Sequence, residues 1–220
     1  PAVVLRGEGA WKQALPKLAS LGKAPLLLGR SGATAGLRAE LNTDLASVSL
    51  QPTQAELQFD CCEQDLQRLA AEASACDAVV AAGGGKVLDA GKLLAHRLGL
   101  PCITVPLSAS TCAGWTSLSN LYSPDGAFQG DVALDRCPDL LVFDHALVRQ
   151  APSRTLASGI ADALAKWYEA SVSSRDSSDG LVQQAVQMAR VLRDQLLIDG
   201  PLAMRDPNSA AWARTAEACA

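Results

Sequence analysis

Short apolar runs alternate with helical segments through the first two-thirds of the chain, and this alternation limits the possible folds more than any other feature. The strands that we predict are Val3–Leu5, Pro25–Gly29, Ala46–Leu50, Ala78–Ala82, Cys102–Pro106 and Leu140–Phe143. The helices that we predict between them are Trp11–Leu21, Thr34–Leu41, Glu63–Ala75 and Lys86–Leu98. Strands that alternate with helices favour a parallel sheet covered on both faces, so the pattern predicts the α/β class.

Two places depart from the alternation. The sequence YSPDGAFQG holds a Pro-Asp-Gly turn between two β-forming runs, which predicts a hairpin. Residues 153–220 contain helical segments rich in Ala, Leu, Gln and Arg and no convincing strand. We therefore predict an α/β domain over residues 1–151 and the first part of an all-helical domain over residues 152–220. The final NSAAWARTAEACA has no capping Gly or Asn after it, so we expect a truncation within a helix.

Composition and charge exclude several classes of function. The net charge is −4, and no basic run interleaved with aromatic residues is present, which disfavours nucleic acids and anionic membranes as partners. No apolar stretch has the length of a transmembrane helix, and the N-terminus lacks the apolar region of a signal peptide. The seven cysteines include no C-x-x-C pair, so we expect free thiols in a reducing cytoplasm.

Three consecutive glycines, Gly83–Gly85, stand between a predicted strand and a predicted helix. The first turn of a helix has unpaired N–H groups and partial positive charge, and glycines let an anion approach them. Lys86 adds a cation, so the turn predicts a phosphate cradle. The P-loop pattern is not met, because Val80 and Val87 stand where it needs Gly and Ser or Thr. The alternative is a tight packing turn in which Asp89 only favours the first turn of the helix.

Three segments carry a resemblance to a known family. They are GGGKVLDAGKLLAHRLGLPCITVPLSAST, SLSNLYSPDGAF and CPDLLVFDHALVRQAPSRTLASGIADALAKWYEA. The chain resembles the glycerol dehydrogenases and their relatives in the iron-containing (group III) alcohol dehydrogenase family, within the dehydroquinate-synthase-like superfamily. The resemblance implies an α/β domain, a helical domain, and a cleft between them that holds NAD or NADP and a divalent metal. It also implies hydride transfer between that cofactor and a small alcohol or carbonyl compound, and assembly into a homo-oligomer.

The resemblance assigns cofactor contacts to two segments. The residues that it implies at the pyrophosphate and nicotinamide ribose are Gly84, Gly85, Lys86 and Asp89. The residues that it implies along the nicotinamide half, within LSASTCAGWTSLSNLY, are Ser110, Thr116, Leu118 and Tyr122. Without the resemblance, this second segment would be interpreted as a strand-to-loop transition.

The metal site implied by the resemblance is incomplete in this chain. Asp162 matches an aspartate that binds zinc or iron and serves catalysis, although its spacing alone also fits an ion pair with Lys166. The family's two histidine ligands have no match, because neither His96 nor His145 aligns with them. A catalytic zinc takes three protein ligands and an open position, so we expect these residues alone to be catalytically incompetent.

Two further residues depart from the glycerol dehydrogenase pattern. Cys112 stands where those enzymes have an aspartate that positions the polyol, so we expect a substrate other than glycerol. Arg30 stands where NAD-selective relatives often have an acidic residue. Because Arg favours a 2′-phosphate, we expect NADP to be tolerated or preferred, unless Arg30 is only an exposed residue beyond a strand.

Two other functions remain open on sequence grounds. A lyase of the dehydroquinate synthase type would use and regenerate NAD, but it needs more basic residues than the predicted cleft offers. A nucleotide-binding module without turnover would account for the unmatched histidine ligands.

Overall fold

The computed structural model describes residues 1–220, and the chain divides into two compact units. The first unit comprises Pro1–Leu107 and Cys112–Gln150. The second unit comprises Ala151–Ala220 together with the short segment Ser108–Thr111.

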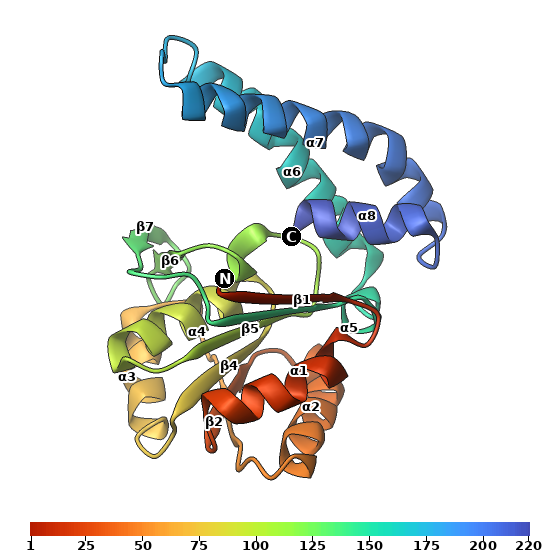
Figure 1. Ribbon diagram of the computed structural model, residues 1–220. Helices are drawn as coiled ribbons and strands as arrows, with labels where there is room; N and C mark the ends of the chain where they lie inside the picture. The colour runs from red at the N-terminus through yellow and green to blue at the C-terminus, as the bar shows by residue number, and fades with distance from the viewer. The chain divides into compact units, whose positions relative to one another are not determined.

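A parallel sheet of six strands forms the centre of the first unit (Figure 1). In spatial order the strands are β1 (Val3–Gly7), β8 (Leu140–Asp144), β5 (Cys102–Pro106), β4 (Ala78–Gly83), β2 (Pro25–Gly29) and β3 (Thr53–Glu56). Every residue of β2, β4, β5 and β8 is buried, which explains their continuous apolar sequences. The parallel sheet confirms the predicted α/β class.

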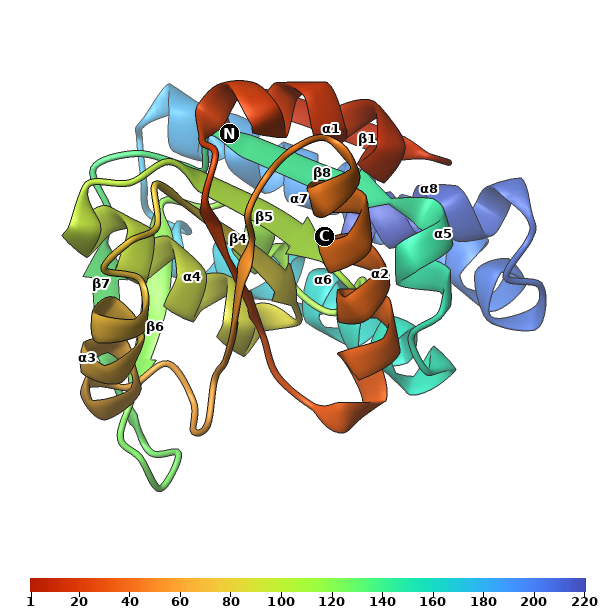
Figure 2. The ribbon, with the colours of Figure 1, turned by 90° about the horizontal axis from the view of Figure 1, so that it is seen from below.

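Two apolar clusters form the core, one on each face of the sheet. Successive strand residues point to opposite faces, so Val79 packs in one cluster and Val80 in the other. The first cluster is covered by α3 (Glu63–Glu72) and α4 (Gly85–Leu98), and the second by α1 (Ala10–Leu21) and α2 (Ala35–Ser47). Figure 2 shows the two pairs of helices on opposite sides of the strands. The short helix α5 (His145–Arg149) follows β8 directly.

One predicted strand is wrong, and the others lie where the sequence places them. The predicted strand Ala46–Leu50 is instead the end of α2 and a turn, because Leu41 and Leu45 are buried one helical turn apart. The strand in this part of the chain is β3, at the edge of the sheet, where only Ala55 is buried. An edge strand with one buried side chain has no apolar run, so its sequence carried no strand signal.

The predicted hairpin is confirmed. Strands β6 (Leu118–Tyr122) and β7 (Phe128–Ala133) pair antiparallel in a separate two-stranded sheet. Gly126 has a φ of 88°, a left-handed conformation that glycine adopts without strain, and its N–H donates to Ser123 O at 2.9 Å. Leu121 and Tyr122 pack against the apolar cluster under α4, which fixes the hairpin on the first unit.

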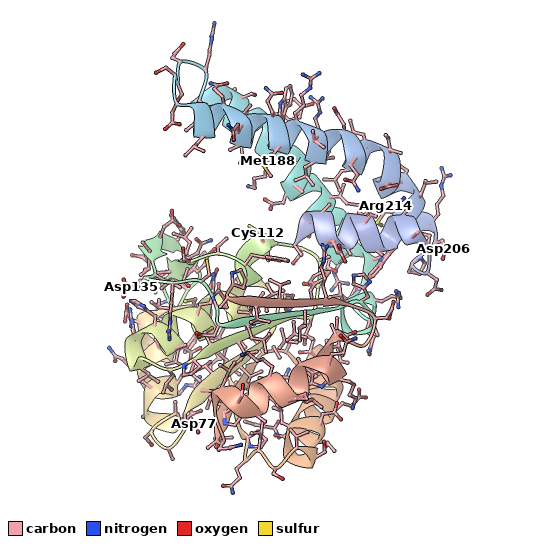
Figure 3. The ribbon with its side chains drawn as sticks, in the orientation of Figure 1. Asp77, Cys112, Asp135, Met188, Asp206 and Arg214 are labelled. Carbon is pink, nitrogen blue, oxygen red and sulfur yellow. The ribbon has the colours of Figure 1, made fainter.

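The second unit contains helices and no strand, as predicted for residues 153–220. Its helices are α6 (Ser153–Ser173), α7 (Gly180–Arg205) and α8 (Ala210–Cys219). Arg214 of α8, labelled in Figure 3, donates two hydrogen bonds of 2.8 Å to the carboxylate of Asp199 on α7. A Cβ atom on Gly159 would lie 2.0 Å from Ala109 O, so α6 approaches the segment Ser108–Thr111 closely only because residue 159 is glycine. None of the helices is both long and apolar enough to span a membrane.

Candidate functional site

The glycine turn joins the end of β4 to the start of α4. Gly84 is the N-cap, its backbone is extended, and no side chain caps it. The N–H groups of Val87 and Leu88 both donate to Gly84 O, at 3.0 and 3.1 Å. The preceding amides of the first helical turn have no acceptor within the helix. Gly83 has a packing reason of its own, because a Cβ atom there would lie 2.7 Å from the Val87 Cβ.

A pocket of about 300 Å³ opens at this turn. Its lining comprises the segment Gly83–Val87 and the side of the turn after β2, with Arg30, Ser31 and Thr34. Strands β2 and β4 are parallel neighbours in the sheet, so the residues that follow them meet at the carboxyl ends of the strands. The Thr34 hydroxyl and the Arg38 guanidinium donate to Arg30 O at 2.8 and 2.9 Å, which fixes the turn. Two cations and several backbone amides therefore surround the pocket.

Asp60 connects the two cations. Its carboxylate accepts hydrogen bonds from Arg30 Nη1 at 2.6 Å and from Lys86 Nζ at 2.5 Å. Burial alone would raise the pKa of Asp60, but the hydrogen bonds from Lys86 and Arg30 outweigh it and lower that pKa. The Lys86 ammonium also lies 5.7 Å from the centre of the Tyr122 ring, within the range of a cation–π contact.

Asp89 and Lys92 form a buried ion pair on α4, away from the pocket lining. The Lys92 ammonium lies 3.2 Å from the Asp89 carboxylate, and the Lys92 side chain is only 1% exposed. The same ammonium donates to Thr116 Oγ1 at 3.1 Å, to Thr116 O at 3.2 Å and to Leu118 O. Burial raises the pKa of Asp89, although the charge of Lys92 and a backbone hydrogen bond from Asn120 oppose that change. The pair thus fastens α4 to the start of β6.

The residues predicted along the nicotinamide half lie in different places. Thr116 and Leu118 surround Lys92, whereas Tyr122 lies beside Lys86. Ser110 belongs to the second unit, and its hydroxyl lies 3.1 Å from that of Ser108. Cys112, labelled in Figure 3, begins a short 3-10 turn and is exposed.

Asp162 lies on α6 and forms an ion pair with Lys166 at 3.3 Å. Its side chain is 47% exposed, and Lys166 also contacts Glu169 at 3.2 Å. This is the ion pair that the sequence spacing offered as an alternative. No group of three or more His, Cys, Asp or Glu residues with the arrangement of a metal site exists within residues 1–220. Asp162 therefore does not form a metal site with the other residues of this chain.

Four predicted residues line the pocket and a fifth lies beside one of them, whereas Asp60 beside the pocket and Lys92 on α4 were not predicted. The residues that meet there are Gly84, Gly85, Lys86, Arg30 and, through Lys86, Tyr122. Asp60 was missed because a single aspartate in a loop carries no pattern. Lys92 had a signal that could have revealed it, because it is a charged residue directly before two leucines, one helical turn after Asp89.

Known proteins resemble this chain in sequence and in structure. A model of the iron-containing alcohol dehydrogenase family matches residues 1–145. An uncharacterized oxidoreductase of Synechocystis sp., slr1167, is 44% identical in an alignment of 220 residues that covers 99% of this chain and 57% of that protein. A glycerol dehydrogenase of Escherichia coli O6:H1 is 38% identical in an alignment of 152 residues that covers 66% of this chain and 41% of that protein.

A solved structure has the same fold as the whole chain. The crystal structure of a probable glycerol dehydrogenase from Sinorhizobium meliloti 1021 superimposes with a TM-score of 0.85 at 28% identity, over 100% of this chain and 63% of that one. This chain spans about half the length of the curated relatives named above. The family model matches more than half of this chain, and the Synechocystis relative aligns with almost all of it. The chain therefore belongs to the iron-containing alcohol dehydrogenase family.

Proposed function

We propose that this protein is an NAD(P)-dependent oxidoreductase, which transfers a hydride between the nicotinamide and a small alcohol or carbonyl compound. The observation that carries the proposal is the pocket at the start of α4, where uncapped helix amides, Arg30 and Lys86 surround a space of about 300 Å³. Such a site suits the diphosphate of a dinucleotide, because amide donors and cations both favour negative charge. The relatives named above are oxidoreductases by name, which favours this function over a lyase.

We assign each residue of the pocket to a different part of the cofactor. Backbone amides of Gly84 and Gly85 and the ammonium of Lys86 would hold the diphosphate, and Arg30 would lie on the side of the adenosine ribose. NAD(P), when bound, supplies the hydride acceptor or donor. The Tyr122 ring lies 5.7 Å from the Lys86 ammonium, so it contributes a cation–π contact beside the proposed diphosphate site.

The remaining predicted cofactor residues have supporting roles. We assign Asp89 a positioning role, because it is buried against Lys92 and that pair holds β6 on α4. Thr116 and Leu118 contact the same ammonium, so the pair also fixes the segment that we propose for the nicotinamide half. Ser110 stays a candidate contact for that half, on the basis of the resemblance alone.

The residues of this chain do not fit a bound metal ion. Asp162 remains the candidate ligand, but it is half exposed and paired with Lys166, and one carboxylate does not hold a catalytic metal. No general base is identifiable either. The chemistry that the chain itself supports is therefore cofactor binding and orientation.

The substrate class, the assembly and the compartment are parts of the same proposal. We propose a small hydroxy or carbonyl compound other than glycerol, because Cys112 has a weakly bonding thiol where glycerol dehydrogenases have a carboxylate. We further propose a homo-oligomer in the cytoplasm. The support for a reducing compartment is that all seven cysteines are free thiols.

Titration with NADH, followed by fluorescence, tests the proposal. Wild type should bind, and Lys86→Ala should weaken binding by about tenfold or more, because it removes a charge-assisted contact to phosphate. Lys17→Ala is the matched control, since Lys17 is exposed on α1 and lies outside the pocket lining. Equal affinities of all three proteins, or no binding by folded wild type, would refute the cofactor site.

A second assay separates a dehydrogenase from a binding module. NAD(P) reduction is measured with zinc or iron added, over a panel of diols. For residues 1–220 alone we expect cofactor binding without turnover, because Asp162 has no partner ligands. Metal-dependent turnover by these residues would contradict that expectation.

A further inference from the structure

We infer that Asp60 determines how well the site accepts NADP relative to NAD, because its carboxylate engages the guanidinium that a 2′-phosphate would need. The inference rests on the proposed function, since it concerns the same pocket. It adds a residue that neither the glycine turn nor the resemblance pointed to.

In the proposed site, Arg30 is the residue that would contact the adenosine ribose. It directly follows β2, the strand next to the one that carries the glycine turn. In doubly wound sites, a carboxylate near that place bonds the 2′-hydroxyl of NAD, whereas an Arg accommodates the 2′-phosphate of NADP. By itself, Arg30 therefore predicts a site that favours NADP.

The loop that carries Asp60 holds the carboxylate against Arg30. On one side of Asp60, the Leu57 N–H donates to Gly29 O at 2.8 Å. The Phe59 N–H donates to the Asp65 carboxylate at 2.8 Å. On the other side, the Tyr122 N–H donates to Cys61 O at 2.8 Å. With its backbone fixed on both sides and its side chain only 9% exposed, Asp60 cannot swing far from the two cations.

Because Asp60 neutralises part of the positive charge, the site is less favourable to a 2′-phosphate than Arg30 alone suggests. Two cations and one carboxylate leave a net charge of about +1, which a diphosphate already compensates. A 2′-phosphate adds about two negative charges and would have to displace Asp60 from Arg30 or lie beside it. Like charges placed next to each other oppose binding, so Asp60 penalises NADP more than NAD.

The test compares NADH and NADPH dissociation constants in four proteins: wild type, Asp60→Asn, Arg30→Ala and the double variant. Wild type should bind NADH at least as tightly as NADPH. Asp60→Asn should shift the NADPH/NADH preference toward NADPH by about tenfold, since it frees one charge-assisted contact for the 2′-phosphate. The substitution also frees Lys86, which would contact the diphosphate common to both cofactors, so that effect should change both affinities together. The double variant should lose the gained preference, because the freed guanidinium is gone.

One control and one alternative comparison keep the result specific. Glu63→Gln breaks another carboxylate–Arg pair of the first unit, with hydrogen bonds of 2.6 and 2.7 Å to Arg97, outside the pocket lining, and it should leave the preference unchanged. If Asp60→Asn does not fold, the comparison of wild type with Arg30→Ala still decides. A guanidinium held by Asp60 contributes little, so that change should shift the preference by less than about threefold.

The outcomes separate this inference from the function on which it rests. NADH binding by wild type with an unchanged preference in folded Asp60→Asn would overturn the role of Asp60 and leave the cofactor site in place. A tenfold loss of NADPH preference in Arg30→Ala alone would also overturn it, because it would show that Arg30 is free to bind the phosphate. Failure of folded wild type to bind either cofactor would refute the proposed function instead.

Discussion

Replacing Lys92 with Met should destabilise the protein more than any exposed charge change in the first unit. The Lys92 ammonium pairs with Asp89 and donates to Thr116 and to Leu118 O, and its side chain is 1% exposed. Met fills a similar volume, so the substitution removes the charge and the hydrogen bonds without leaving a large cavity. It leaves the Asp89 carboxylate buried, with the Asn120 N–H as its remaining partner.

The expected loss in the free energy of unfolding follows from the removal of the cation that pairs with Asp89. Removing one member of a buried ion pair costs about 3–5 kcal/mol. We expect the lower end, about 3 kcal/mol, because Asp89 can take up a proton once its cation is gone. For a protein of this size, that loss lowers the melting temperature by roughly 6–12 °C.

The pH dependence of the stability lost in Lys92→Met gives a second measurement. The pKa of Asp89 is already raised by burial, and removing Lys92 should raise it further. A carboxyl group with a raised pKa in the folded state stabilises the fold in its protonated form, so this stability is lost as the pH rises through that pKa. The deficit of Lys92→Met relative to wild type should therefore grow from about pH 4 to about pH 7.

Urea unfolding followed by circular dichroism at several pH values measures both effects. Lys12→Met is the matched control, because Lys12 pairs with Asp44 at the surface with its side chain 65% exposed, and its loss should cost less than about 1 kcal/mol. The double variant Asp89→Asn/Lys92→Met should be more stable than the sum of the two single changes predicts. A deficit below about 1 kcal/mol, or one that shrinks with rising pH, would refute the buried pair.

Three further changes test other parts of the structure. Gly91→Ala would place a Cβ atom 2.4 Å from the Ala81 Cβ and push α4 off β4, so calorimetry should show a loss of about 1–3 kcal/mol, and an unchanged melting temperature would contradict that packing. Mass spectrometry after mild alkylation should find exposed Cys112 labelled well before Cys61, whose pKa burial raises to about 12, and equal labelling rates would exclude this difference. Asp60 has a lowered pKa, so its contribution is present above an unfolded pKa of about 3.9 and is lost as the pH falls through the folded value. Lowering the pH from 6 to about 3 should therefore reduce the free energy of unfolding less in Asp60→Asn than in wild type. An equal reduction in both proteins would count against that contribution.

The sequence predicted the centre of the sheet well because its strands are buried on both faces. Strands such as β2 and β5 need continuous apolar residues, and such runs between turn residues are easy to recognise. The edge strand β3 needs only one buried residue, Ala55, so its sequence is polar and gave no signal. The apolar residues after Leu45 were then assigned to a strand that does not exist.

Only the part of the site formed by residues close together in the sequence was predictable. The glycine turn and Lys86 adjoin a strand and a helix, so local pattern was enough to find them. Asp60 reaches Arg30 and Lys86 from a loop that is distant in sequence from both, and only the fold brings the three side chains together. Asp89 was predicted to contact the cofactor from the motif alone. The structure adds that its carboxylate is buried against Lys92, which no local pattern had indicated.

The most direct test of the account observes the backbone amides at the start of α4. In a ¹⁵N–¹H NMR titration of the 22.9 kDa protein with NADH, the resonances of Gly84, Gly85 and Lys86 should shift the most, together with those beside Arg30. Amides elsewhere in the sheet, such as those of β1, should stay unchanged. Saturable NADH binding that leaves the three glycine-turn amides unmoved would show that the diphosphate lies elsewhere and would contradict the account.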